Sequence, residues 1–319
     1  MFGKQTRDED GVVISRREPG SDHILEILAQ DYLREKKTRR RWGMFFRLLI
    51  VAYIATTTWL YFHTSDLTVD EDHVAVVVID GMIGPGEISA PEINHSLKDA
   101  FEAEASKAVI VKINSPGGTP VQAAQINAEI SRLQELHPDK PVYAAISDIC
   151  ASGGYYVAVA ASEIYAHPSS IVGSIGVLMN GFGFTGTMDK LGIERRLITA
   201  GENKGLLDPF SPERPGDRRH AQAMLDDVHG DFIDAVKQGR GERLSNDPDI
   251  FSGLFWSGRK ALELGLVDAF GSEKDIARDV IGVEKLVDYT YRPGILREFA
   301  EHIGVSLGNS FFSSQFRLH

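Results

Sequence analysis

Residues 108–120 of this 319-residue chain read AVIVKINSPGGTP, and they determine the expected fold. The β-branched run at 108–113 predicts a buried strand, because it has the length and composition of a strand covered on both faces. Thr119 is a good helix N-cap and Pro120 suits the first helical position, so a helix is expected from there to Leu136. Strand, glycine turn and helix in this order are typical of a mostly parallel sheet covered by helices.

The same alternation continues on both sides of this stretch. Further strands are expected at 74–79, 141–146, 163–166 and 171–179. Further helices are expected at 92–106, 155–161, 218–239 and 258–264. Everything from about residue 73 onward therefore reads as one α/β domain.

The composition is that of a chain that buries a core. Hydrophobic residues make up 43% and charged residues 25%, which excludes a wholly disordered or collagen-like protein. The net charge of −11 argues against a nucleic-acid-binding surface. The single cysteine, Cys150, excludes an intrachain disulfide, and the absence of clustered Cys and His residues argues against a zinc site. No metal or cofactor is expected.

Residues 44–64 (MFFRLLIVAYIATTTWLYFHT) predict a transmembrane helix. The run has roughly the 20 residues needed to cross a bilayer, and no charged residue occurs from Leu48 to Thr64. Six basic side chains within residues 34–41 place the N-terminus in the cytoplasm by the positive-inside rule. A buried core helix and a cleaved secretory signal are alternatives, but the long polar lead favours a retained signal-anchor.

Four parts of the chain are therefore expected. They are a polar cytoplasmic tail (1–43), a signal-anchor helix (44–64), an acidic linker (65–72) and an extracytoplasmic domain (73–319). The amphipathic segment at about 295–319 is expected to mediate oligomerisation.

Two strand-to-helix junctions are candidates for chemistry. At residues 114–118 (NSPGG), paired glycines leave backbone N–H groups accessible to a phosphate or a developing oxyanion, although an ordinary βα turn has the same composition. At residues 150–156 (CASGGYY), Ser152 lies at a helix start between small neighbours. That placement suits a nucleophile, although serine at a helix start is more often an ordinary N-cap.

A serine nucleophile needs a base. Lys204 lies among glycines and apolar residues in GENKGLLDPF (201–210), where desolvation would favour a neutral amine, although an exposed loop lysine is the alternative. None of the ten histidines lies in a glycine-rich junction, and His167 is among the nearest in sequence to Ser152.

Taken together, five segments resemble the bacterial signal peptide peptidase A family, whose members are membrane-bound serine proteases with a Ser/Lys dyad. The segments occur in family order as NSPGG (114–118), ASGGYY (151–156), VGSIGV (172–177), NKGLLDPF (203–210) and GRKALELGLVDAFGS (258–272). The resemblance implies a crotonase/Clp-protease-like ββα spiral, which is an α/β fold with a mostly parallel sheet.

The resemblance also implies roles for individual residues. Ser152 would be the nucleophile and Lys204 the general base, and Ser174 would orient the lysine amine. Gly118 and Gly153 would offer oxyanion N–H groups. The single Ser/Lys set matches the short form of the family, which implies a homo-oligomeric ring in which one subunit can supply the serine and its neighbour the lysine.

The implied setting is a bacterial inner membrane that the chain crosses once, with the N-terminus in the cytoplasm. The implied substrates are apolar peptides, such as cleaved signal peptides, that reach the site from the bilayer. Three alternatives stay open: an acyl-CoA-processing enzyme on the same fold, an inactive membrane scaffold, and a protease that uses a histidine such as His167 as its base.

Overall fold

The computed structural model describes residues 36, 39–59 and 71–292. The chain divides into two units, Met1–Thr68 and Val69–His319. Most of the expected tail and linker, and all of the expected oligomerisation segment at 295–319, lie outside the described residues.

In the first unit, Arg39–Trp59 form a 21-residue helix that is long and apolar enough to cross a membrane. At about 1.5 Å per residue, such a helix is about 32 Å long, close to the thickness of a bilayer core. This helix overlaps most of the expected anchor at 44–64.

In the described part of the second unit, eight strands form one sheet. The order is β6-β5-β3-β2-β1-β8, with β4 beside β3 and β7 beside β4. All pairs are parallel except β5 with β6. The strands are β1 (His73–Asp80), β2 (Ser106–Ser115), β3 (Val142–Ala151), β4 (Glu163–Ala166), β5 (Ile171–Gly173), β6 (Phe255–Ser257), β7 (Ala269–Phe270) and β8 (Leu286–Asp288).

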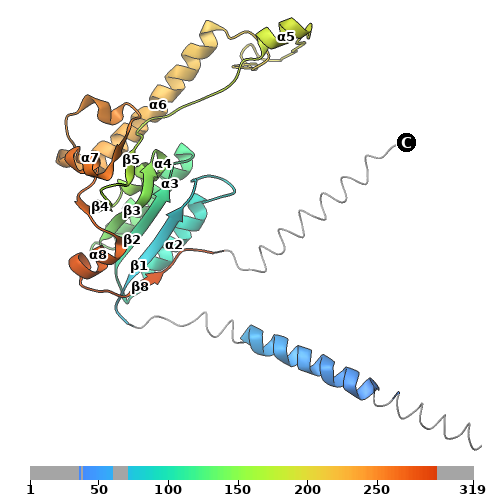
Figure 1. Ribbon diagram of the computed structural model, residues 1–319, viewed down its shortest axis with the longest axis vertical. Helices are drawn as coiled ribbons and strands as arrows, with labels where there is room; N and C mark the ends of the chain where they lie inside the picture. The colour runs from blue at the N-terminus through green and yellow to red at the C-terminus, as the bar shows by residue number, and fades with distance from the viewer. Residues whose placement is uncertain (1–35, 37–38, 60–70, 293–319) are drawn as a thin grey trace, which may run out of the picture. The chain divides into compact units, whose positions relative to one another are not determined.

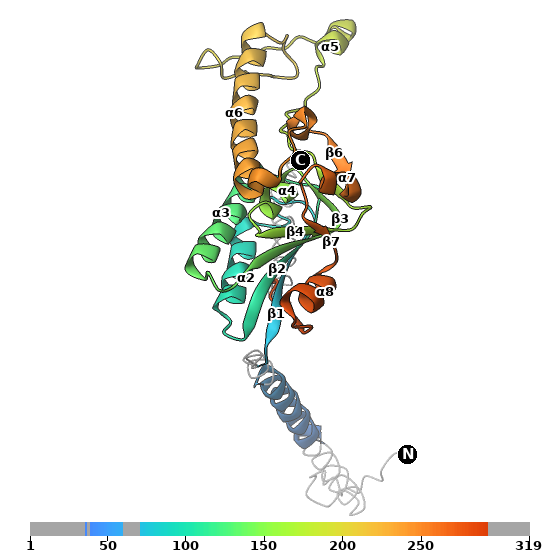
Figure 2. The ribbon, with the colours of Figure 1, turned by 90° about the vertical axis from the view of Figure 1, so that its left-hand side faces the viewer.

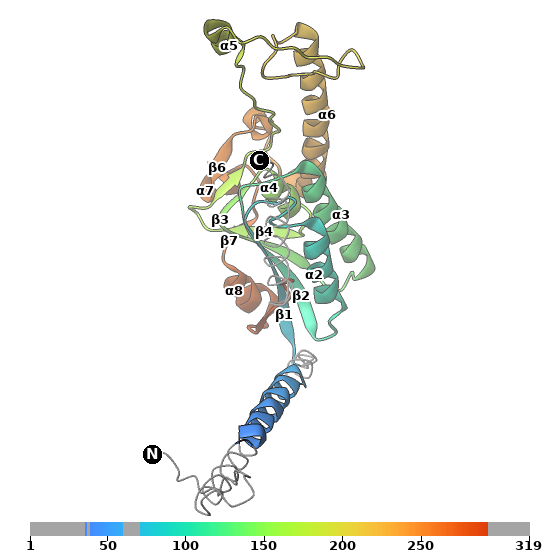
Figure 3. The ribbon, with the colours of Figure 1, turned by 90° about the vertical axis from the view of Figure 1, so that its right-hand side faces the viewer.

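Helices cover both faces of this sheet (Figures 2 and 3). The helices are α2 (Ala90–Glu102), α3 (Pro120–Leu136), α4 (Gly153–Ala158), α5 (Thr185–Leu191), α6 (Pro215–Arg240), α7 (Gly258–Glu263) and α8 (Glu273–Asp275). Short turns η1 (Gly241–Arg243) and η2 (Pro248–Phe251) follow α6, and the π-helical turn η3 (Ile276–Ile281) continues α8.

The alternation of side chains along β1 shows how the sheet buries both faces. Ala75, Val77 and Ile79 belong to the core under α2, α3 and α4. Val74 and Val76 point to the opposite face and pack in a smaller core with residues of η3. A strand that is apolar on both sides is the pattern expected of a parallel sheet between two layers of helices.

Helix α6 leaves the sheet partway along its length. Its last turns pack on α4, where the rings of Tyr156 and Phe232 lie 4.9 Å apart between centroids. Its first turns extend beyond the sheet together with residues 178–214, which include α5 (Figure 1). We call residues 178–214 and the first half of α6 the arm.

The α/β class and the mostly parallel sheet that were expected are confirmed. Helix α3 spans the residues expected of it. The strand expected at 171–179 is wrong beyond Gly173, because β5 ends there. Gly173 has φ +110° and Ser174 has φ +53°, values that break an extended strand.

The close contact between α6 and α4 gives a first prediction. A Cβ on Gly239 would overlap the carbonyl oxygen of Val159, whereas a Cβ on Gly230 of the same helix would meet nothing within 4 Å. We expect Gly239→Ala to lower the free energy of unfolding by about 1–3 kcal/mol through overpacking. Gly230→Ala should raise it by about 0.5–1 kcal/mol, because alanine is the better helix former.

Urea unfolding of the two variants, followed by circular dichroism, checks this prediction. Equal stability of the Gly239→Ala and Gly230→Ala variants would contradict the described packing of α6 on α4.

Candidate active site

Three chain segments meet at the carboxyl ends of β2, β3 and β5. In the register of the sheet, Ser115 pairs with Cys150, and Ala151 pairs with Gly173. Parallel strands end at the same edge of a sheet, so the segments that follow these pairs are neighbours in space. These segments are NSPGG (114–118), ASGGYY (151–156) and VGSIGV (172–177), three of the five motifs in the sequence.

Ser152 sits in a strained backbone turn at this edge. Its φ and ψ are +51° and −122°, outside the regions that L-residues ordinarily occupy. The turn is held because the Ser152 N–H donates to the Gly173 carbonyl at 2.8 Å, and the Ser152 carbonyl accepts from the Tyr156 N–H at 3.0 Å. A non-glycine residue in such a turn is stable only when its surroundings fix it, and such turns cluster at functional sites.

The hydroxyl of Ser152 does not cap helix α4, although Ser152 occupies the N-cap position. Within residues 71–292 it makes no hydrogen bond to a protein group. Ser152 therefore occupies the N-cap position without using its hydroxyl as a cap. The hydroxyl is free to react with a substrate.

Two backbone N–H groups lie beside Ser152. A Cβ on Gly117 would come within 2.8 Å of the Ser152 Cβ and 3.1 Å of the Gly153 nitrogen. A Cβ on Gly153 would in turn lie 3.1 Å from the Gly118 nitrogen. The N–H groups of Gly118 and Gly153 are thus close to each other and to Ser152. Neither donates to another group in the described part of the chain, so both can bind an oxyanion.

The glycines of NSPGG are required by this close approach. Gly117 has φ +121°, and a Cβ on Gly118 would overlap the backbone of Ile83. The loop is anchored because the Gly117 N–H donates to the Ser115 hydroxyl at 3.2 Å and the Ile83 N–H donates to the Gly117 carbonyl at 2.8 Å. Any larger residue at 117 or 118 would displace the candidate oxyanion donors.

Ser174 lies one residue beyond the carbonyl that holds Ser152. Its φ of +53° is again strained, and its N–H donates to the Leu254 carbonyl at 2.8 Å. The hydroxyl of Ser174 has no protein hydrogen-bond partner among the described residues. The structure thus brings Ser152, Ser174, Gly118 and Gly153 together at one edge of the sheet.

Lys204 is not part of this cluster within one chain. It lies exposed in a turn of the arm, where its N–H donates to the Gly201 carbonyl at 3.1 Å. This turn lies beside the first residues of α6, because Arg214 Nη1 donates to the Glu202 carbonyl at 3.4 Å. Rising about 1.5 Å per residue, α6 separates Pro215 from Phe232, which contacts α4, by about 25 Å.

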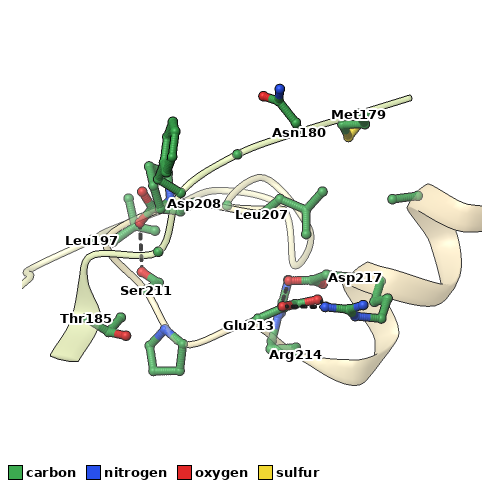
Figure 4. Close-up of a pocket in the computed structure, with 18 of the residues that line it drawn as sticks. Met179, Asn180, Thr185, Leu197, Leu207, Asp208, Ser211, Glu213, Arg214 and Asp217 are labelled. Atoms are coloured by element: carbon green, nitrogen blue, oxygen red, sulfur yellow. Dashed lines mark hydrogen bonds and ion pairs between the residues drawn. The ribbon is translucent and has the colours of Figure 1, made fainter. Parts of the chain in front are cut away.

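A cavity of about 1160 Å³ lies in the arm, between its loops and the first turns of α6 (Figure 4). Its walls are held by three pairs: the Ser211 hydroxyl donates to Asp208 at 2.7 Å, Arg214 donates to Asp217 at 3.0 Å, and Arg218 donates to Glu213 at 2.7 Å. The cavity shares no lining residue with the three segments around Ser152. It is therefore a feature of the arm and not of the candidate active site.

Two histidines bear on the alternative of a histidine base. His167 lies in the connection between β4 and β5, where its Nδ1 accepts the Ser169 N–H at 3.1 Å. His229 of α6 has its Nε2 3.1 Å from the Ile175 carbonyl oxygen. Neither forms a hydrogen bond with Ser152 in the described structure. Of these two histidines, His229 is the one that reaches the VGSIGV segment.

Cys150 directly precedes the Ser152 turn but is buried in the core. Burial raises the pKa of the Cys150 thiol well above its ordinary value, because the thiolate loses its hydration. Since the thiolate is the reactive form, Cys150 is not a competing nucleophile.

Two site residues escaped the sequence analysis. Gly173, whose carbonyl holds Ser152, was expected within a strand and within the VGSIGV segment, but with no role of its own. Trp256 of β6 packs against Gly173, but its position just before a helix carried no signal that could be read from the sequence. No group of three or more His, Cys, Asp or Glu side chains that could hold a metal occurs among the described residues.

Comparison with known proteins places this site in context. Residues 134–286 match peptidase family S49. A "Putative protease" of Synechocystis sp. is 33% identical over 202 residues, covering 63% of this chain and 71% of that protein. The "Serine protease SPPA, chloroplastic" of Arabidopsis thaliana is 31% identical over 218 residues, covering 65% of this chain and 32% of that protein.

A Brucella abortus protein named "Na(+)/H(+) antiporter NhaA" is 42% identical over 246 residues. The alignment covers 75% of this chain but only 33% of the Brucella protein. The chain thus spans about a third of that relative, and the remaining two thirds of the relative have no counterpart in the alignment.

The burial of Cys150 predicts that its thiol resists alkylation. With its pKa raised, the thiol stays protonated at pH 8, and no reagent can reach it through the core. We expect iodoacetamide to leave the native protein unmodified while modifying Cys150 fully in urea, as judged by intact mass. Modification of the folded protein within minutes would show that the core around Cys150 is open.

Proposed function

Because the chain belongs to peptidase family S49, we propose that it is a membrane-anchored serine endopeptidase with Ser152 as nucleophile and Lys204 as general base. The observation that carries the proposal is the Ser152 turn: a strained serine, its hydroxyl unengaged among the described residues, beside the N–H groups of Gly118 and Gly153.

The proposed reaction has two steps. The neutral amine of Lys204 takes the hydroxyl proton of Ser152 as the serine oxygen attacks a peptide carbonyl carbon. The N–H groups of Gly118 and Gly153 bind the tetrahedral oxyanion, and the lysine then gives its proton to the departing amine. Water next attacks the acyl-enzyme through the same base, releases the acid product and restores the Ser152 hydroxyl.

The lysine would come from a neighbouring subunit. Along α6, about 25 Å separate the turn of Lys204 from the contact with α4, so an arm that reaches outward suits delivery to a second copy. Ser174, whose hydroxyl has no described protein partner, would accept an N–H of the seated amine and orient its lone pair.

The arm supports assembly because it exposes many large apolar side chains. An exposed apolar surface of this extent is typical of a protein interface. Those within residues 178–214 are Leu178, Met179, Phe182, Phe184, Leu191, Ile193, Leu197, Ile198, Leu207 and Phe210. We propose that a homo-oligomeric ring buries them.

The helix Arg39–Trp59 would anchor this ring as a signal-anchor. With the basic residues before it in the cytoplasm, the chain would cross a bacterial inner membrane once and carry residues 73–319 on the outer side. Substrates would be apolar peptides left in the bilayer, such as cleaved signal peptides, bound in extended form beside Ser152.

The dyad is tested with the full-length chain in detergent. Ser152→Ala and Lys204→Ala should each lower the rate of casein cleavage by about 10³-fold or more, because each removes a group that reacts directly. Neither change lies in the core, so circular dichroism and particle mass should stay those of the wild type. Full activity of the Ser152→Ala variant would overturn the proposed function with Ser152 as nucleophile, whereas a wild type that cleaves no casein would favour the non-proteolytic scaffold or the acyl-CoA enzyme.

Mixing the two inactive variants separates a shared dyad from a dyad within one chain. If subunits exchange, a Ser152→Ala subunit can still donate its lysine to a Lys204→Ala neighbour, and activity should return in part. An absence of recovered activity after co-expression and co-purification would contradict the shared site.

The role of the arm is tested with Ile198→Arg. Ile198 is 96% exposed in the single chain, so a charge there should cost the monomer little but should prevent burial against a neighbour. Leu136→Arg is the matched control, because Leu136 is 61% exposed at the end of α3, where a cation is tolerated. Light scattering should show loss of the ring for Ile198→Arg alone, and an intact ring would show that the arm is not the contact.

A further inference from the structure

The indole of Trp256 carries a buried polar group to which the proposed reaction assigns no role. Trp256 lies in β6 opposite Val172 of β5. Its Nε1 is buried and has no hydrogen-bond partner among the described residues. Indole can only donate, and a buried donor without an acceptor costs free energy, so such groups in native proteins call for an explanation.

Trp256 packs directly on the turn that forms the site. A Cβ on Gly173 would lie 3.1 Å from the Cδ1 and 3.6 Å from the Nε1 of Trp256. The edge of the indole that bears the N–H therefore occupies the space that a side chain at residue 173 would need. This explains why residue 173 is a glycine, in addition to its φ of +110°.

This contact places the donor beside Gly173, which is joined to both serines. The Gly173 carbonyl accepts the Ser152 N–H at 2.8 Å, and Ser174 is the following residue. Ser174 is also tied to the strand of Trp256, because its N–H donates to the Leu254 carbonyl at 2.8 Å. The unpartnered donor thus lies beside Gly173, the residue that connects the Ser152 turn to Ser174, and the Ser174 hydroxyl also has no protein partner among the described residues.

We infer that Trp256 is a positioning residue for the proposed reaction, and that its indole N–H donates to the hydroxyl oxygen of Ser174 once the lysine of a neighbouring subunit is seated. One lone pair of the Ser174 oxygen is then held by the indole, and the other accepts an N–H of the Lys204 amine. The amine lone pair is thereby directed at the Ser152 hydroxyl. This inference rests on the proposed function.

The alternative is that Trp256 serves packing alone, and Trp256→Phe separates the two roles. Phenylalanine keeps an aromatic ring on Gly173 but has no N–H. If the ring only packs, the variant should keep wild-type kinetics and should be at least as stable, because an unpaired buried donor has been removed. If the N–H positions Ser174, kcat should fall by about tenfold with KM changed less than twofold, because only the geometry of the base is disturbed.

The assignment to Ser174 is tested by a double-mutant cycle in the full-length oligomer. In the Ser174→Ala background, Trp256→Phe should lower kcat by less than twofold, since the acceptor is already gone. Additive losses would overturn the link to Ser174. Wild-type kcat in the single Trp256→Phe variant would overturn the role of the N–H altogether.

Two further variants keep the outcome interpretable. Replacement of Trp256 by 3-benzothienylalanine, which has sulfur in place of the N–H and the same shape, decides the question if Trp256→Phe fails to fold. Tyr165→Phe is the control. It removes a hydroxyl that donates to Glu163, and the ring of Tyr165 packs in the core on the other face of the sheet. This variant should leave kcat unchanged.

The proposed function and this inference fail in different ways. Retention of activity by Ser152→Ala would overturn the function, whatever Trp256 does. Loss of activity in Ser152→Ala, combined with wild-type kcat in Trp256→Phe, would leave the protease intact and overturn only the positioning role.

Discussion

The hydrogen bond from the Ser152 N–H to the Gly173 carbonyl holds the candidate site together. It joins the end of β3 to the end of β5, and it fixes Ser152 in a backbone conformation that an isolated peptide would rarely adopt. The remainder of the site depends on this bond. The glycines of NSPGG must approach the turn closely, and Trp256 must fill the space beside Gly173.

The parallel sheet supplies the rigidity that this arrangement needs. β2 and β3 are buried between helices on one face and a second apolar cluster on the other, so their carboxyl ends cannot shift independently. Tyr155 adds an anchor below the turn, because its buried hydroxyl donates to the Leu266 carbonyl at 2.8 Å. The packed core beneath the turn therefore stabilises the strained backbone conformation of Ser152.

The sequence predicted those parts of this structure that depend on local pattern. The β-branched runs predicted the strands, and Thr119 and Pro120 predicted the start of α3, because these signals act within a few residues. The extent of β5 was overestimated, since only the pairing with β6 and the turn at Gly173 show where it ends. The meeting of Gly118, Gly153 and Ser174 around Ser152 was expected only through family resemblance. The contact of Trp256 with Gly173 depends on strand pairing across about eighty residues, and no local pattern encodes it.

Because the arm reaches outward, the proposed assignment makes activity depend on assembly. A single newly inserted chain carries the nucleophile without its base and is therefore inactive. No propeptide has to be removed, because encounter with sister chains completes the site. Cleavage would then rise more steeply than in proportion to surface density in the membrane, and a sparse population of chains would spare neighbouring proteins during export.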